Sequence, residues 1–151
     1  MPQPNVETLK FKIGLSGTYW DKRPAYSILI NGVEQASRFV GAEPGIVEYE
    51  EFTVDLGENQ PHTLSIRLEN KDNTDTLLDA DGVTIVKDML LNINSIEIDD
   101  VDLGQLMWGA SKFVPDDAAW PTIEGCVNLG WNGSYNLTFS SPFYLWLLEN
   151  M

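Results

Sequence analysis

Oxygen-bearing side chains crowd one stretch of the chain, residues 69–88, which lies between two segments with strand-like patterning. Calcium takes six to eight oxygen ligands from carboxylates, amides and backbone carbonyls, and this stretch offers that donor set. The sequence therefore contains a candidate calcium site. Its candidate ligands are Asn70, Asp72, Asp75, Asp79, Asp81 and Asp88.

The stretch does not match an EF-hand. Gly82 comes too early after Asp79 and Asp81, no bidentate glutamate follows at the required distance, and the flanks are predicted strands. The alternative interpretation is that Asp81-Gly82 forms a hairpin turn while the other acidic residues are solvated. Both interpretations remain open at this point.

Catalytic residues are few. His62 is the only histidine, and because it follows Pro61 at the start of a predicted strand we expect it to be exposed in a turn. Together with the single Cys126 it cannot fill a zinc coordination shell without carboxylates. A pair of carboxylates acting as general acid and base is a minor alternative. We therefore expect a chain that is not an enzyme and has no catalytic residues.

Aromatic residues in polar loops provide a second candidate binding surface. The faces of pyranose sugars stack on exposed Trp and Tyr rings, although partial burial or assembly contacts would also explain such residues. Trp108 and Trp146 lie in apolar surroundings and are expected in the core. The candidate glycan-binding residues are Tyr19, Trp20, Trp120 and Trp131.

Alternation of apolar and polar residues recurs along the chain, which is typical of strands with one face in a core. It is clearest over residues 9–15, 26–30 and 64–68, and Asn31-Gly32 supplies the positive φ angles of a two-residue hairpin turn. The sequence predicts an all-β fold, an antiparallel β-sandwich or jelly roll with short loops and little helix.

Some segments depart from simple alternation. The apolar phase changes within residues 47–56 and again near Asn94-Ser95, and each change predicts a bulge or bend. Residues 130–133 are predicted to form a hairpin tip, and residues 143–148 a C-terminal strand.

Length and charge limit the organisation and the partners. A chain of 151 residues suits one domain, here an N-terminal tail over residues 1–7 and a sandwich over residues 8–151. Within the sandwich we expect a core at 8–103 and an extension at 104–151 that packs on it. The formal charge of −14 repels phosphate backbones and anionic lipids, which disfavours nucleic-acid partners. No apolar run is long enough for membrane insertion.

Cysteine usage and the first residues bear on the compartment. Cys126 has no partner for an internal disulfide, which fits folding in a reducing cytoplasm. The first five residues combine neither a basic region nor an apolar run, so no retained signal peptide is expected.

Residues 8–103 resemble the small calcium-dependent carbohydrate-binding modules that recognise xylan-type chains. The resemblance is carried by the strand at residues 9–13, the hairpin ending at 30–32, the strand at 63–68, the acidic loop, and Asp88 ahead of residues 91–99. It implies a jelly roll in which a loop beside one sheet holds calcium, and the metal ligates sugar hydroxyls. Asn70 or Asp72, and Asp88, match positions of that metal loop.

Residues 130–149 faintly resemble extensions in structural proteins of tailed phages, particularly those of marine cyanobacteria. This resemblance implies a virion or extracellular location after cytoplasmic folding, with glycans, other virion proteins or further copies of the chain as partners. Two hypotheses follow, a non-catalytic carbohydrate-binding module used for adhesion or decoration, and a purely structural assembly subunit without glycan binding.

Overall fold

The apolar side chains of the alternating segments meet in one interior. The structure, a computed structural model, describes residues 5–151. In the strand β1 (Val6–Thr18), Leu9, Phe11, Ile13 and Leu15 are fully buried. The first four residues of the predicted tail, on which the signal-peptide expectation also depends, lie outside the described residues.

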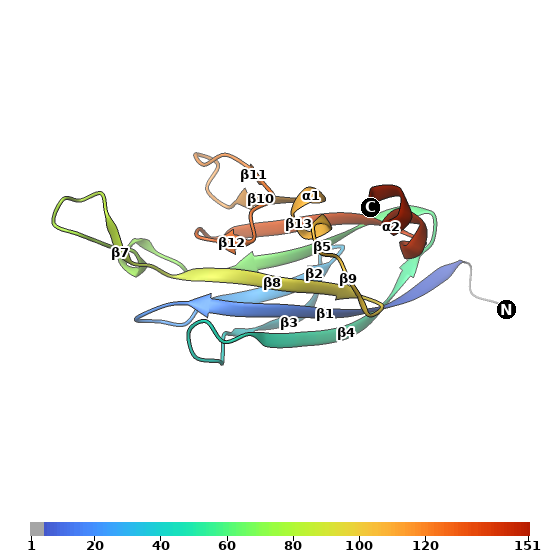
Figure 1. Ribbon diagram of the computed structural model, residues 1–151, viewed down its shortest axis with the longest axis horizontal. Helices are drawn as coiled ribbons and strands as arrows, with labels where there is room; N and C mark the ends of the chain where they lie inside the picture. Colours follow the sequence, from blue (N-terminus) through green and yellow to red (C-terminus); the bar gives the residue numbers. More distant parts are fainter. Residues whose placement is uncertain (1–4) are drawn as a thin grey trace.

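Two antiparallel sheets form the layers of the sandwich (Figure 1). Sheet A contains, in spatial order, β12 (Asn128–Leu129), β8 (Leu90–Ile98), β1 and β4 (Glu48–Gly57), with β9 (Val101–Asp102) paired to β8. Sheet B contains, in order, β11 (Ile123–Glu124), β10 (Ser111–Pro115), β13 (Gly133–Ser141), β5 (Gln60–Leu68), β2 (Ala25–Ile30) and β3 (Val33–Phe39).

Two of the remaining elements lie at the ends of the sandwich. A separate hairpin of β6 (Leu77–Leu78) and β7 (Ile85–Lys87) projects from one end, whereas the C-terminal helix α2 (Phe143–Asn150) lies at the other (Figure 1). A 3-10 turn, η1 (Asn73–Asp75), precedes the hairpin, and a short helix, α1 (Leu106–Gly109), precedes β10. None of the helices within residues 5–151 is long and apolar enough to span a membrane.

The predicted all-β sandwich is confirmed, together with two of its local features. Asn31 and Gly32 have φ angles of 50° and 81°, as the hairpin between β2 and β3 requires. The bulge near Asn94 is also present, because the pairing of β1 with β8 passes from Gly14 opposite Ser95 to Leu15 opposite Ile93.

The bulge predicted within residues 47–56 is wrong. β4 pairs with β1 in a continuous register, and its even-numbered residues face inward throughout. Glu50 is therefore buried, where it accepts a hydrogen bond of 2.7 Å from the Tyr26 hydroxyl and pairs with Arg38 at 2.6 Å. Because Glu50 is polar and yet points inward, the hydropathy pattern changes there as if the strand contained a bulge. Its hydrogen bonds make the burial of the carboxylate possible.

The strand predicted at residues 143–148 is a helix. Phe143 and Trp146, three residues apart, are both buried, and Trp146 packs against Phe139 and Phe143, while Tyr144 and Leu145 face outward. This spacing follows a helical period. The helix start is stabilised by Glu7, whose carboxylate accepts a hydrogen bond of 2.9 Å from the Phe143 amide.

Residues 130–132 are not a hairpin tip, because they cross from sheet A to sheet B. They leave β12, which pairs with β8, and enter β13, which lies between β5 and β10. Residues 104–151 thus contribute an inner strand of sheet B. The proposed boundary between a core and an extension stays a prediction.

Candidate functional site

Three loops meet near the end of the sandwich from which the β6–β7 hairpin projects. The Asn132 side chain joins two of them, because its amide oxygen accepts from the Lys71 backbone N–H and its amide nitrogen donates to the Lys71 carbonyl, both at 2.7 Å. The third loop follows β10, and its Asp116 amide donates to the Asn132 carbonyl at 2.9 Å. This arrangement fixes Trp131, the neighbour of Asn132, at the junction.

The three loops enclose a groove of about 380 Å³. Its walls combine indole rings with carboxylate, amide and hydroxyl groups. The lining residues are Lys71, Asp72, Asn73, Thr76, Pro115, Asp116, Asp117, Trp120, Trp131 and Asn132.

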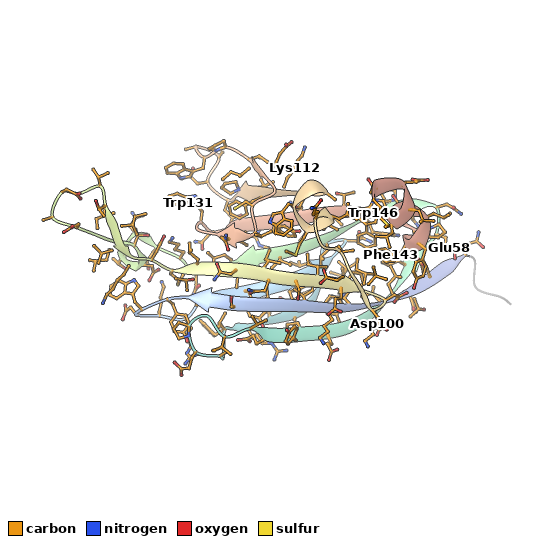
Figure 2. All side chains as sticks on the ribbon, viewed as in Figure 1. Glu58, Asp100, Lys112, Trp131, Phe143 and Trp146 are labelled. Atoms are coloured by element: carbon orange, nitrogen blue, oxygen red, sulfur yellow. The ribbon has the colours of Figure 1, made fainter. Side chains whose placement is uncertain are left out.

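Trp120 and Trp131 form the aromatic wall of this groove. Their ring centroids are 4.6 Å apart and their planes differ by 17°, so the indoles stack face to face. They remain 48% and 43% exposed, respectively. Trp131 lies at the opposite end of the molecule from Phe143 and Trp146 (Figure 2). Two of the four predicted glycan-binding aromatics are therefore brought together.

The other two predicted aromatics lie outside the groove. Trp20 donates its indole N–H to the Asp75 carbonyl at 2.9 Å, and the Lys87 ammonium lies 5.3 Å from its ring centroid. The Tyr19 hydroxyl donates to the Ala42 carbonyl at 2.7 Å, on a different loop. The structure gives both residues structural contacts and does not place them beside Trp120.

The groove lining also supplies hydrogen-bonding oxygens that the fold holds in place. Asp116 accepts two hydrogen bonds from one guanidinium nitrogen of Arg67, at 2.8 and 3.0 Å. Asp117 Oδ1 accepts from the Ala119 amide at 2.9 Å. Among the residues that the structure describes, the second Asp117 oxygen and the Asn73 amide make no hydrogen bond, so both are available to a ligand.

Asp72 and Asp75, two of the predicted calcium ligands, bind the same ammonium group. Lys22 Nζ lies 3.0 Å from Asp72 and 2.9 Å from Asp75. The two carboxylates also form a capping box around η1, in which Asp72 accepts from the Thr74 amide and Asp75 from the Asp72 amide. Hydrogen bonds from Thr74 and Lys22 lower the pKa of Asp72 to about 2. The same carboxylates raise the pKa of Lys22.

Asp88 forms an ion pair with a second lysine, Lys71. Its Oδ1 accepts from Lys71 Nζ and the Thr76 hydroxyl, both at 2.7 Å, and from the Met89 amide at 2.8 Å. Partial burial alone would raise the pKa of Asp88, but these hydrogen bonds outweigh it and the pKa is lowered.

The remaining predicted ligands have separate structural partners. The Asn70 side chain bonds the Ala25 amide and the Arg23 carbonyl, which ties the loop to β2. Asp79 and Asp81 belong to the projecting hairpin, where Asp81 accepts from the Val83 and Thr84 amides and the Thr84 hydroxyl. These bonds lower the pKa of Asp81 to about 2. The predicted turn at Asp81-Gly82 is thus present, with Gly82 at φ 72°.

These donors do not fit a calcium ion in this arrangement. Within residues 5–151, no three or more His, Cys, Asp and Glu side chains gather in a group that could hold a metal. Lys22 lies between Asp72 and Asp75, and Lys71 pairs with Asp88, so an ammonium group already neutralises each of these carboxylates. The six predicted ligands instead order the loop, and calcium binding by them stays a prediction.

Two residues lie elsewhere than hydropathy suggested. His62 is buried, where its ring accepts from the Asn31 amide at 2.9 Å and donates to the Gly57 carbonyl at 2.8 Å. Trp108 is 44% exposed and borders a second cavity of about 570 Å³ with Lys112 and Glu124. Trp146 is buried as expected.

Sequence comparison and structure comparison give different results for this chain. No protein-family model and no curated protein matches the sequence. Among solved structures, the chain is similar to the module vCBM60 in complex with galactobiose, with 10% identity, a TM-score of 0.50, and coverage of 85% of this chain and 96% of that one. It is similar also to the selenomethionine form of vCBM60, with 10% identity, a TM-score of 0.51, and coverage of 85% and 89%. That structure is described in a study of two families of calcium-dependent carbohydrate-binding modules. The sandwich of this chain therefore has the fold of vCBM60.

Proposed function

We propose that this chain is a non-catalytic carbohydrate-binding module and that the groove between Trp120, Trp131 and the loop at residues 71–76 holds the sugar. The observation that carries the proposal is the exposed indole pair in one groove with fixed oxygen acceptors. A pyranose ring combines apolar C–H faces with hydroxyl donors around its edge, so it needs both features within one ring width.

The polar wall suits neutral sugars in particular. Asp72, Asp116 and Asp117 present carboxylate oxygens, which accept hydrogen bonds from hydroxyls. The same carboxylates, in a chain with a net charge of −14, would repel a sulfated or uronic-acid polymer. Galactobiose, the ligand in one vCBM60 structure, and xylo-oligosaccharides are therefore suitable first probes.

We expect the groove to bind the sugar without hydrolysing it. A glycosidase needs a carboxylic acid whose pKa is raised, whereas the pKa of Asp72 in this groove is lowered to about 2. His62 cannot assist, because it is buried in the interior. The fold similarity to carbohydrate-binding modules supports the same conclusion.

The test compares two exposed tryptophans. Wild-type protein is screened on an array of neutral oligosaccharides, and the strongest ligand is titrated by calorimetry against the variants Trp120→Ala and Trp108→Ala. Loss of the stacking face in Trp120→Ala is expected to weaken binding by about tenfold or more. Trp108→Ala, an equally exposed residue at the second cavity, should bind as the wild type does. Equal effects of the two substitutions would reject the groove as the site.

An assembly subunit is the second candidate, because the projecting β6–β7 hairpin exposes a cluster of apolar residues. These are Leu77, Leu78, Val83, Ile85 and Val86. Exposed apolar clusters on a projecting element are typical of contact surfaces. A location in a virion, with contacts to other virion proteins or to copies of this chain, belongs to this candidate. A mass measurement in solution tests self-association, and a strict monomer at high concentration would count against that part.

A further inference from the structure

Two lysines hold the loop that forms one wall of the groove. Lys22 comes from the segment after β1 and reaches across to Asp72 and Asp75 at the capping box of η1. The Asp75 side chain is 3% exposed, so its charge is almost fully removed from water. An ionised carboxylate at such a position requires a cation or several hydrogen bonds.

Lys71 holds the other side of the same loop. Its side chain is 8% exposed, and its ammonium contacts Asp88 Oδ1 and the Gly130 carbonyl oxygen, both at 2.7 Å. The ammonium also lies 5.6 Å from the centroid of the Trp131 ring. One buried charge thus joins the acidic loop to the aromatic wall of the groove.

We propose that Lys22 and Lys71 serve as the internal cations of this loop, in place of a bound divalent ion, so that the groove is formed and binds its ligand without calcium. The part that concerns ligand binding rests on the function proposed above. The loop requires positive charge between its carboxylates, and the chain supplies that charge itself.

Charge and geometry both favour the lysines over an added ion. A calcium ion at Asp88 or at the Asp72–Asp75 pair would lie within a few ångströms of an ammonium group, which would repel it. Calcium also needs six to eight oxygens, whereas Lys22 already contacts one oxygen each of Asp72 and Asp75, and Lys71 contacts Oδ1 of Asp88. A calcium ion that took Asp88 from Lys71 would leave the Lys71 ammonium without a carboxylate partner in a mostly buried place.

The first experiment is a thermal melt of the wild-type protein in about 5 mM calcium chloride and in excess chelator, without sugar. A site with a Kd of about 1 mM would raise Tm by about 2–4 °C at that concentration. The proposal expects the two Tm values to agree within about 1 °C. A reversible rise in calcium would overturn it.

The second experiment removes one ammonium group. Lys71→Met keeps much of the side-chain volume but leaves Asp88 without its cation, so Tm is expected to fall by about 5–10 °C. Lys10→Met is the matched control, because Lys10 pairs with Asp100 at 3.6 Å on the exposed surface, and its Tm should change by about 1 °C or less. Equal shifts in the two variants would refute the role of Lys71. If Lys71→Met does not fold, Lys22→Met is compared with the same control.

Glycan titrations in calcium and in chelator separate this inference from the function on which it rests. Equal affinities in the two buffers are expected. Binding only in calcium would refute the inference and leave the carbohydrate function intact. If the array shows no ligand, the proposed function fails, whereas the melts still decide whether the lysines replace a metal in folding.

Discussion

Asn132 joins the loops that form the groove. Its side-chain amide pairs with both backbone groups of Lys71, in the manner of a short stretch of β-ladder. Asn132 precedes β13 and follows Trp131, so the same contact positions one indole and one lysine. The relative positions of Trp131 and Lys71 in the groove thus depend on the side chain of Asn132.

Substitution of Asn132 should change both stability and binding. Asn132→Ala removes two hydrogen bonds and leaves the partly buried N–H and C=O groups of Lys71 without these partners. The loss is expected to lower the free energy of unfolding by about 1–3 kcal/mol. Sugar affinity should fall as well, because Trp131 is no longer held. Urea denaturation and calorimetry measure the two effects. Asn128→Ala, in the neighbouring strand β12, is the control, and an equal loss of stability there would contradict the interpretation.

At this scale the sequence predicts residue types better than their partners. Trp120 and Trp131 were identifiable as loop aromatics, but their stacking depends on two loops that different strands position. The pairing of Glu50 with Tyr26 and Arg38 could not be predicted, because the partners are 24 and 12 positions away. The lysines that neutralise the acidic loop could not be predicted for a related reason, because Lys22 lies 50 positions before Asp72 and Lys71 lies 17 positions before Asp88.

The secondary-structure elements differ in how strongly the sequence specifies them. Strand β5 and residues 9–15 of β1 carry a clear sequence period of two because one set of alternate side chains lies in the core. The two-residue strands β11 and β12 carry no period, since their pairing is set by the loops around them. Helix α2 was mistaken for a strand because its residues are apolar on every side, so that neither period stands out.

Two substitutions in α2 distinguish the helix from the strand first predicted there. In a strand, positions 144 and 146 would point to the same face, whereas in the helix Trp146 is buried and Tyr144 is exposed. Trp146→Ala is expected to lower the free energy of unfolding by about 3–5 kcal/mol through the cavity it leaves against Phe139 and Phe143. Tyr144→Ala should cost about 0.5 kcal/mol or less.

Chemical denaturation provides the measurement for both variants. A large loss for Trp146→Ala with almost none for Tyr144→Ala agrees with the helix. Similar losses for the two would indicate that positions 144 and 146 share a face, as in a strand.

The whole molecule combines a conventional interior with an acidic exterior. The chain has 23 acidic and 9 basic residues, and most of the basic side chains form ion pairs with acidic side chains of the same chain. The lysine and arginine side chains therefore neutralise specific carboxylates, while the remaining carboxylates on the surface repel one another. The class of fold was predictable from the sequence because it depends on patterning. The groove was not, because it exists only where loops from both halves of the chain converge.

The response to acid follows from how the fold uses its carboxylates. The pKa values of Asp72 and Asp81 are lowered from 3.8 to about 2 by hydrogen bonds, so the folded state binds fewer protons than the unfolded state between these values. Their contribution to stability is therefore complete above about pH 4 and is lost as the pH falls toward 2. Surface repulsion acts in the opposite direction, because it weakens as the pH approaches the isoelectric point of about 4.1.

The urea midpoint, followed by tryptophan fluorescence, should thus fall as the pH drops below about 4. Thr84→Val removes the hydroxyl donor to Asp81 without changing charge, and is expected to flatten the fall below pH 4. Thr53→Val, on the exposed face of β4, controls for the change of side chain. Equal falls below pH 4 in Thr84→Val and in the wild type would contradict this account of Asp81.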